Sequence, residues 1–493
     1  MPKRGKCLWG YIPHRVRIVA RQKAEITLQQ RRQLQRVAAK RRETDYAGFL
    51  PIAEFLGARL RLRPLVIAHF DYPKGPTSTY SSADMVMGLV GMMTMGLENV
   101  RQMAKFALEI EPARALGLER FYGEDTLRRM LDRIRDPHVD QIREAHRAIR
   151  HQERKRIFGQ KGDIDVDVDF SGLPARARQR EGCVYGYTHG KRQPCYQMWR
   201  ICVNGFPWEG DIDPGNVYND ACFDGGLETA RQIAKYERAR RICLRGDTFF
   251  YSRERLSRCL DLAGRRPNFR FFLIGHATRG ENHFVNRLAR EHADRPGWQP
   301  FSKTTEVLDI GRAEILPGII VPRVVLIRER FRYSYRRGRK RKVHTKMRCR
   351  VLLGNSTRKE EPTAVAVYQK YQGRQIEEHS FCDSKQGFWR LKFPAQEFQA
   401  NRFWFHCVML AHTGLWLAQR ELLPPRGEGM YTKTLRETLI RVGGKNRGTW
   451  NHPDAGHLQR AAAQASVGES GPRATADHHT LVNGSPRSRL TGF

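Results

Sequence analysis

The segment DIDVDVDF, residues 163–170, alternates acidic and apolar side chains. This period of two predicts a half-buried strand, with four aspartates on one face and apolar residues on the other. Four carboxylates on one face repel one another unless water or a cation separates them. The segment is therefore either an acidic edge strand that resists aggregation or part of a charged functional site.

Strand-like and helical segments alternate after this point. CYQMWRICV and GFPWEGDI are strand-like and joined by an Asn-Gly turn, and they are followed by a helical segment, the strand ICLRGD, a second helical segment and the strand NFRFFLIGHA. This order predicts a mixed α/β sheet. Asp169 and Asp247 each close a strand, where such sheets place their chemistry, although Asp247 equally suits a turn or a helix cap.

The segment YQKYQGRQIEEHSFCDSK, residues 368–385, places four different polar side chains at helical spacing. They are Tyr371, Arg374, Glu378 and Lys385. Counted from the tyrosine, the other three fall about 300°, 340° and 320° around a helix axis, so all four share one narrow face. Such a face is either solvated, with an ion pair between Arg374 and Glu378, or it binds a ligand.

The net charge narrows the choice of partner. The 493 residues include 88 basic and 51 acidic side chains, and an excess of +37 is most simply explained by nucleic acid, with an anionic membrane as a weaker candidate.

The ten cysteines include no CxxC pair, which predicts neither a zinc site nor a disulfide framework. No secretory signal is recognisable, and the apolar runs 85–97 and 403–418 are shorter than the roughly 20 residues that a membrane span needs. A cytoplasmic protein is expected.

Residues 278–362 predict a hairpin with a basic tip, because GIIVPRVVLIRERFRYSY and KMRCRVLLG flank RRGRKRK. Aromatic side chains interleaved with arginine suit stacking on bases and contact with phosphates, although a charge run can also be only a solvated surface. The predicted DNA contacts here are Tyr333, Tyr335, Arg336, Arg337, Arg339, Lys340, Arg341 and Lys342. Trp298 is either a packed residue or a stacking partner for a flipped base.

Several motifs resemble one family. The spacing of Tyr, Arg, Glu and Lys in YQGRQIEEHSFCDSK resembles the Y-R-E-K signature of the large insertion-sequence group of DDE transposases. DVDFSGLP resembles the first aspartate segment of that group and selects Asp169, while LRGDTFF resembles the second and selects Asp247. GEDTLRRML resembles the group's N-terminal helical region. The likeness runs from about residue 46 to about residue 440.

The resemblance implies a ribonuclease H-like catalytic core that is interrupted by a β-rich insertion. Asp169, Asp247 and Glu378 would be the catalytic residues and would bind two Mg²⁺ ions per active site, with Mn²⁺ as a substitute. Asp167 precedes Asp169 by one pleat pair on the same face, so it is the alternative ligand.

The resemblance also implies cut-and-paste transposition, in which water cleaves the element's end and the freed 3′ hydroxyl attacks target DNA. A hairpin step at the element end stays open. Tyr371, Arg374 and Lys385 would contact phosphates at the transposon end. The implied partner is double-stranded DNA, both terminal inverted repeats and target, bound by a homodimer in a synaptic complex. The implied location is the bacterial cytoplasm, associated with the nucleoid, with no membrane contact.

The predicted organisation has five parts. They are a loosely ordered basic arm (1–45), a helical N-terminal DNA-binding domain (46–155), the catalytic core (156–277 and 363–423), the β-rich basic insertion (278–362) and a largely disordered tail (424–493). Within the helical domain, the methionines at 85, 87, 92, 93 and 95 are predicted to fill a core.

Other functions fit the same residues. TWNHPDAGHLQRAAAQASVGESGPRATADHHT is unlike the basic and apolar ending of the relatives, so we hypothesise a degenerate or frame-shifted end. A non-catalytic relic that represses transposition by binding DNA is then the alternative function, and a nuclease of the same fold that cuts without joining is a third. GYTHGKR, residues 186–192, fails as a phosphate loop, having three residues between its glycines and no Ser or Thr after Lys191.

Overall fold

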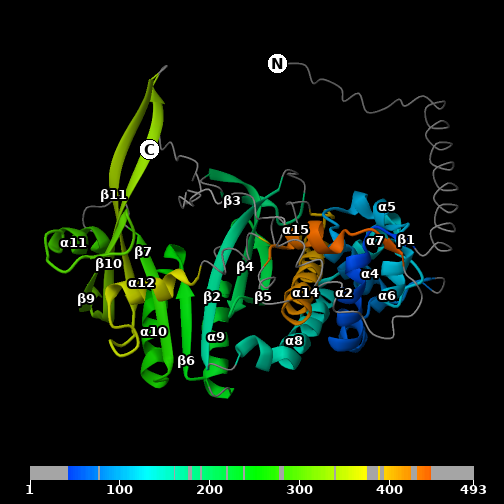
Figure 1. The fold of residues 1–493 in the computed structure, drawn as a ribbon, viewed down its shortest axis with the longest axis horizontal. Coiled ribbons are helices and arrows are strands. Elements are labelled where there is room, and N and C mark those ends of the chain that lie inside the picture. Colours follow the sequence, from blue (N-terminus) through cyan, green and yellow to red (C-terminus); the bar gives the residue numbers. More distant parts are fainter. Residues whose placement is uncertain are drawn as a thin grey trace, which may run out of the picture. The chain divides into compact units, whose positions relative to one another are not determined.

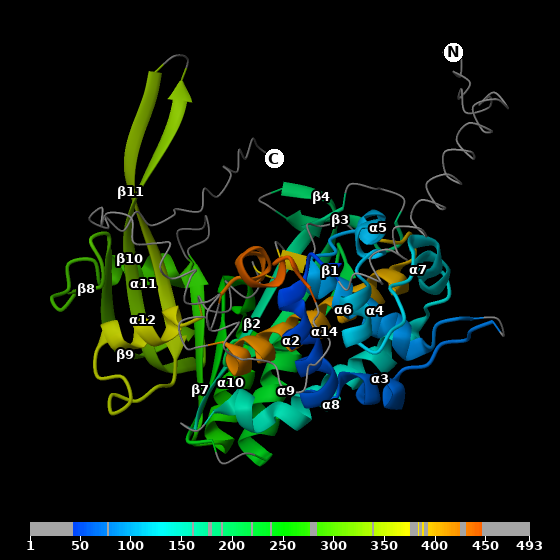
Figure 2. The same cartoon turned by 45° about the vertical axis from the view of Figure 1, so that its right-hand side comes forward.

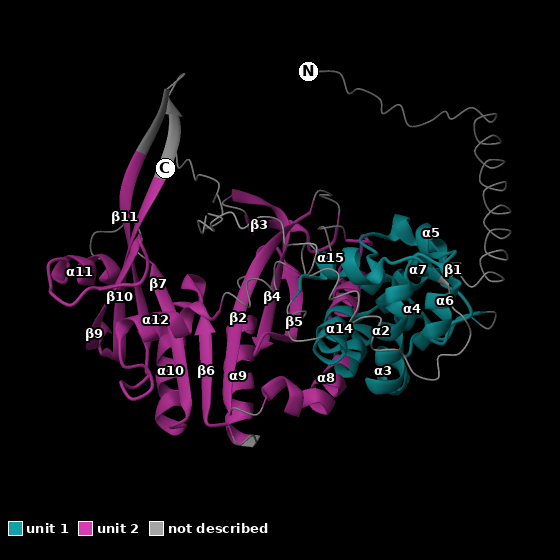
Figure 3. Ribbon diagram, viewed as in Figure 1, with its two compact units in different colours: residues 1–145, 387–389, 410–477 teal, residues 146–386, 390–409, 478–493 magenta. Residues whose placement is uncertain are grey.

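The chain folds into two compact units that interleave along the sequence (Figure 3). The computed structural model describes residues 43–75, 78–159, 162–175, 180–188, 191–217, 220–236, 239–276, 283–337, 340–374, 383, 387–388, 393–423 and 430–445. Unit 1 comprises residues 1–145, 387–389 and 410–477, and unit 2 comprises residues 146–386, 390–409 and 478–493. The finer domain boundaries drawn from the sequence remain a prediction.

Unit 2 is built on a mixed sheet that has ten strands in the described residues (Figure 1). The strands are β2 (Asp163–Pro174), β3 (Val184–Thr188), β4 (Lys191–Val203), β5 (Phe206–Pro214), β6 (Arg241–Gly246), β7 (Phe269–His276), β8 (Gln299–Pro300), β9 (Thr305–Leu316), β10 (Ile319–Arg337) and β11 (Lys340–Gly354). Their order is β3-β4-β2-β6-β7-β11-β10-β9-β8, and β5 pairs with β4. The predicted mixed α/β sheet is confirmed.

Strand β2, which carries the aspartates, lies inside this sheet. It runs antiparallel to β4 and parallel to β6, while β4 is antiparallel to β5 and β6 is parallel to β7. The edge-strand alternative is therefore wrong, because β2 carries a hydrogen-bonded ladder on both sides. Parallel strands end at the same edge of a sheet, so the carboxyl ends of β2, β6 and β7 lie at one edge.

Helices cover both faces of the sheet around β2. On one face, Gly226 of α9 (Asp220–Tyr236) lies so close to Val168 that a Cβ there would sit 2.2 Å from a valine methyl carbon, which is why glycine is needed. Helix α10 (Arg253–Arg265) packs beside α9 and against β7. On the other face, Lys370 of α12 (Ala364–Gln372) reaches Asp165, because alternate residues of a strand point to opposite faces. Beneath α12 lies an apolar core of Cys243, Phe272, Ile274, Val325, Leu352, Val367, Tyr368 and Tyr371.

Strands β10 and β11 form the predicted hairpin, with register from Arg323↔Gly354 to Arg337↔Lys340. Strand β9 pairs with β10 only as far as Glu329, and β7 pairs with β11 only from Arg350 onward. Residues 331–337 and 340–348 therefore pair only with each other among the described strands, and we call them the β10–β11 arm. Because β11 is antiparallel to β7, the arm extends beyond the carboxyl end of β7 (Figure 2).

A buried ion cluster fixes α14 (Phe398–Leu422) to β5 within unit 2. Asp211 accepts from Arg402 Nη2 at 2.5 Å and from Nε at 3.2 Å, and His406 Nε2 lies 3.4 Å from the same carboxylate. Burial alone would raise the pKa of Asp211, but His406 and Arg402 outweigh it and hold this pKa well below the usual range.

Unit 1 is mainly helical. Its helices are α2 (Leu50–Glu54), α3 (Leu62–His69), α4 (Ser82–Met95), α5 (Met103–Phe106), α6 (Ile110–Ala115), α7 (Glu124–Leu131) and α15 (Thr432–Leu435), together with the π-helical turns η2 (Phe55–Arg59) and η7 (Arg436–Ile440). Helices α8 (Asp136–Phe158) and α14 have residues in both units. Helix α11 (Phe284–Glu291) belongs to unit 2, with α9, α10 and α12. A capping box between Ser81 and Asp84 starts α4. The five methionines of this region are buried, which confirms their predicted core role.

Part of the predicted C-terminal tail is folded. Leu435 and Leu439 are buried, Arg436 Nε donates to the carbonyl of Thr94 at 2.8 Å, and β12 (Gly444–Lys445) pairs with β1 (Glu43–Thr44). These apolar side chains pack into unit 1, so the folded chain extends beyond residue 424. Among the described residues, no helix combines the length and apolar character needed to cross a bilayer.

Candidate catalytic carboxylate site

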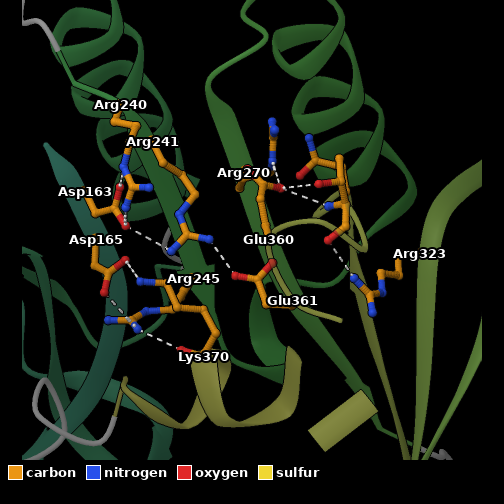
Figure 4. A network of polar contacts seen from close by, with 12 residues as sticks. Asp163, Asp165, Arg240, Arg241, Arg245, Arg270, Arg323, Glu360, Glu361 and Lys370 are labelled. Atoms are coloured by element: carbon orange, nitrogen blue, oxygen red, sulfur yellow. Dashed lines mark hydrogen bonds and ion pairs between the residues drawn. The ribbon is translucent and has the colours of Figure 1, made fainter. Parts of the chain in front are cut away.

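Cations from neighbouring elements neutralise the acidic face of β2 (Figure 4). Arg241 Nη2 donates to Asp163 Oδ2 at 3.1 Å, beside the strand's amino end. Lys370 Nζ donates to Asp165 Oδ1 at 2.6 Å, and Arg245 Nη1 lies 3.1 Å from its other carboxylate oxygen. The repulsion expected from the sequence is therefore relieved by side-chain cations along this part of the strand.

Asp167 is buried and forms a bidentate ion pair with Arg245. The distances are 2.6 Å from Nε to Oδ1 and 2.7 Å from Nη2 to Oδ2. Burial would lower the pKa of the Arg245 guanidinium, but Asp167 and Asp165 raise it above its ordinary value. Only 2% of the Asp167 side chain is exposed, against 15% of the Asp169 side chain. This arrangement favours Asp169 over Asp167 as the metal ligand.

The sheet register brings Asp169 and Asp247 together. Strands β2 and β6 pair in parallel up to Val168↔Gly246, and one further step sets Asp169 beside Asp247. The backbone of Asp247 is still extended, at φ −80° and ψ −172°. Neighbouring strands lie about 4.8 Å apart, so the two carboxylates leave adjacent strand ends on one face of the sheet.

Local backbone contacts orient both carboxylates. Asp169 Oδ1 accepts from the N–H of Phe170 at 2.9 Å, and Asp247 Oδ1 accepts from the N–H of Phe249 at 3.0 Å. Asp247 thereby caps the short 3₁₀ helix η4 (Thr248–Phe250), so the cap role considered from the sequence is confirmed. The rings of Phe170 and Phe249 lie 3.9 Å apart between centroids, which ties the two strand ends together.

Tyr371 and Arg374 reach this pair of carboxylates from the end of α12. Arg374 Nη1 lies 3.4 Å from Asp169 Oδ2. Burial raises the pKa of the Tyr371 hydroxyl; nearby, Arg374 lowers that pKa and Asp247 raises it. The predicted continuous helix face is wrong at this point, because α12 ends at Gln372 and the N–H of Gly373 caps it by donating to Gln369.

Three contributors were missed from the sequence: Arg245, Lys370 and Cys222. Arg245 stands two residues before Asp247, so the strand period could have placed both on one face. The Cys222 thiol donates to the carbonyl of Asp169 at 3.4 Å, and burial, followed by the Asp169 carboxylate, raises its pKa. No sequence signal marked Lys370 or Cys222 as neighbours of the aspartates.

Of the other residues predicted for the metal site and for DNA contact, the structure describes some and not others. Glu378, Lys385 and Arg339 lie outside the described residues. Tyr333, Tyr335, Arg336, Arg337, Lys340, Arg341 and Lys342 lie in the paired strands of the β10–β11 arm. Within the described part of the chain, no group of three or more His, Cys, Asp or Glu side chains could hold a metal ion.

Trp298 is engaged in packing. Its Nε1 donates to the carbonyl of His292 at 3.2 Å, and the Arg328 guanidinium lies 4.1 Å from the ring centroid. Both contacts favour the packed alternative for this tryptophan.

The chain has a distant likeness among solved structures. No family model matches the chain, and no curated protein matches it. In a comparison with solved structures, the chain is similar to the piggyBac transposase in a cryo-EM structure of its synaptic complex with hairpin DNA. The TM-score is 0.40 at 11% identity, over 89% of this chain and 88% of the other. A TM-score of that size establishes neither a shared fold nor a shared activity.

Proposed function

We propose that this protein is a metal-dependent DNA transposase with a ribonuclease H-like core, in which Asp169, Asp247 and Glu378 carry out DNA cleavage and strand transfer. The observation that carries this proposal is the placement of Asp169 and Asp247 at adjacent parallel strand ends. Carboxyl ends of strands are where open α/β sheets place their sites.

The strand order supports the same core. A ribonuclease H-like sheet has three antiparallel strands followed by two strands parallel to the first, each reached through a helix. Strands β2, β4 and β5 form the antiparallel set, and β6 and β7 follow through α9 and α10. The order β5-β4-β2-β6-β7 agrees with that pattern.

The chemistry of the donor set fits divalent cations that prefer oxygen ligands, Mg²⁺ or Mn²⁺. Asp169 and Asp247 are two such ligands, and Glu378 follows Arg374 by four residues, close enough along the chain to supply the third. When bound, two such ions activate the attacking oxygen and stabilise the leaving oxygen. Arg374 and Tyr371 would position the scissile phosphate beside these carboxylates, as a guanidinium and a hydroxyl both donate to phosphate oxygens.

A basic stretch of sequence supports DNA as the substrate. Residues 330–348, which include the β10–β11 arm, contain ten Arg and Lys residues and no Asp or Glu. The arm starts beyond the carboxyl end of β7, at the sheet edge that also carries Asp169 and Asp247. DNA held by the arm would therefore lie near the carboxylates.

The test is Mg²⁺-dependent nicking of the DNA that flanks this gene, searched first for short inverted repeats. Asp247→Asn keeps the capping oxygen but removes the charge, so the fold should persist while nicking falls more than about a hundredfold, since even outer-shell changes at metal sites cost 10–100-fold. Asp163→Asn is the matched control. It lies on the same strand as Asp169 and loses an ion pair, yet it should nick normally because it stands six residues from Asp169.

The outcomes separate the three functions. Nicking followed by joining to target DNA supports a transposase, and nicking without joining identifies a nuclease. Tight DNA binding with no nicking by the wild-type protein would identify the repressor relic and refute the catalytic proposal.

A further inference from the structure

Strand β3 presents two tyrosines to solvent at the edge of the unit 2 sheet. Tyr185 is 53% exposed and Tyr187 is 63% exposed. They stand two residues apart on a strand that pairs only with β4 in the described sheet. Neither ring contacts another ring or donates a hydrogen bond within the described residues. Large aromatic side chains that a soluble domain leaves this open commonly serve binding.

The strand that carries these tyrosines is held rigidly. Gly186 lies between the two tyrosines and Thr188 follows them, and both residues are buried. A Cβ at Gly186 would lie 1.8 Å from the carbonyl oxygen of Gly215. Gln197 Nε2 donates to the carbonyl of Tyr187 at 3.3 Å. With the backbone fixed on both sides, the two rings are displayed at little further entropic cost on binding.

The tyrosines lie close to the carboxylate site along the sheet. Thr188 Oγ1 donates to the carbonyl of Gly172 at 3.0 Å, and Gly172 is three residues beyond Asp169 on β2. That separation is about 10 Å along a strand, or about three nucleotide steps of a DNA strand.

Two basic side chains lie on the neighbouring strand β4, and one of them stands directly opposite a tyrosine. Arg192 pairs in register with Tyr187, and Lys191 pairs with Thr188. Both cations are exposed, and neither forms an ion pair with a carboxylate in the described part of the chain. Aromatic rings beside unpaired cations are the combination that binds single-stranded nucleic acid, the rings stacking on bases and the cations contacting phosphates.

We infer that Tyr185 and Tyr187 form a stacking platform for unpaired bases of the DNA strand next to the cleavage site, with Lys191 and Arg192 contacting its phosphates. Tyr187, Lys191 and Arg192 belong to the sequence GYTHGKR, which is no phosphate loop but would contact DNA through these side chains. This inference rests on the proposed function, because it places a DNA strand at Asp169.

The test compares two DNA probes by fluorescence anisotropy in EDTA, where no cleavage occurs. One is a blunt duplex, and the other is the same duplex with a single-stranded 3′ extension containing 2-aminopurine. The wild-type protein should bind the extended probe more tightly and quench 2-aminopurine by stacking. Tyr185→Ala/Tyr187→Ala should lose between about fivefold and about a hundredfold of affinity per stacked base for the extended probe only.

Two further variants isolate the cause. Tyr185→Phe/Tyr187→Phe keeps both rings and should bind as the wild-type protein does. Val184→Ala removes an exposed apolar side chain from the same edge strand and should also leave binding unchanged. The inference is overturned if the wild-type protein shows no preference for the extension, or if the double alanine variant retains it. Absence of binding to either probe would instead refute the proposed function.

Discussion

At the scale of single residues, the ion pair between Asp167 and Arg245 ties β2 to β6 two residues before the candidate catalytic aspartates. Arg245 also donates to the carbonyl of Lys370 at 2.9 Å, which anchors α12 over the same strands. One guanidinium therefore connects β2, β6 and α12, and Asp247 and Arg374 follow the last two in the chain. The ion pair mainly positions these elements, because a buried pair adds little net stability over apolar residues of the same size.

Removing one partner of this pair should be costly. Asp167→Ala leaves Arg245 buried with part of its charge uncompensated, so the free energy of unfolding of unit 2 should fall by about 3–5 kcal/mol. Asp163→Ala is the control: its partner Arg240 is mostly exposed and its other partner, Arg241, keeps an ion pair with Glu361, so the loss should stay below about 1 kcal/mol. Urea unfolding followed by circular dichroism measures both. Equal losses in the two variants would contradict a special role for the Asp167 pair.

At the scale of elements, the β10–β11 arm is the part most clearly separated from the protein core. Its strands pair only with each other beyond Glu329 and Arg350, so little else in the described sheet constrains them. The register nevertheless continues without a break to Arg337↔Lys340. The basic sequence of this hairpin would suit contact with a polyanion.

The arm should account for much of the salt dependence of DNA binding. Replacing Arg336, Arg337, Arg339, Lys340, Arg341 and Lys342 by Gln should reduce the slope of log K against log salt by up to about 5, at about 0.9 per lost phosphate contact. Fluorescence anisotropy over a salt series gives the slope. Arg231→Gln/Arg258→Gln is the control, because both cations already pair with carboxylates, and its slope should change by less than about 1. An unchanged slope in the arm variant would place DNA elsewhere.

The elements were largely predictable from sequence patterns, and the site only in part. The period of two in DIDVDVDF and the basic hairpin both identified strands, because local alternation fixes which face is buried. The internal position of β2 and the pairing of its aspartates with Arg241, Arg245 and Lys370 were not predictable. Those contacts join residues about 80 to 200 positions apart in the chain, and sequence periodicity carries no information about such neighbours.

The end of α12 shows the same limit. Helical spacing alone predicted an unbroken face from Tyr371 onward, but α12 ends at Gln372 with Gly373 as its C-cap residue. Tyr371 and Arg374 still reach the carboxylates, since a turn brings Arg374 back toward Asp169. Their predicted contact with phosphates at the transposon end stays a prediction.

At the scale of the whole molecule, the excess positive charge and the acidic site would have opposite effects on a DNA phosphate. A net charge of +37 would attract DNA to the protein, whereas the aspartates of β2 form a strand face that would repel a phosphate. Arginine and lysine side chains already neutralise Asp163, Asp165 and Asp167. Divalent cations at Asp169, Asp247 and Glu378 would complete this neutralisation and let a scissile phosphate approach.

The most direct test of this account maps the metal site by Fe²⁺-dependent hydroxyl-radical cleavage of the protein itself. Fe²⁺ bound in place of Mg²⁺, with ascorbate and peroxide, cuts the backbone near its ligands, and mass spectrometry locates the cuts. The account predicts cuts close to residues 169, 247 and 378 that Mg²⁺ suppresses and that Asp247→Asn removes, while Asp163→Asn leaves them unchanged. Cuts at residues 169 and 247 with none near 378, or cuts confined to other parts of the chain, would contradict it.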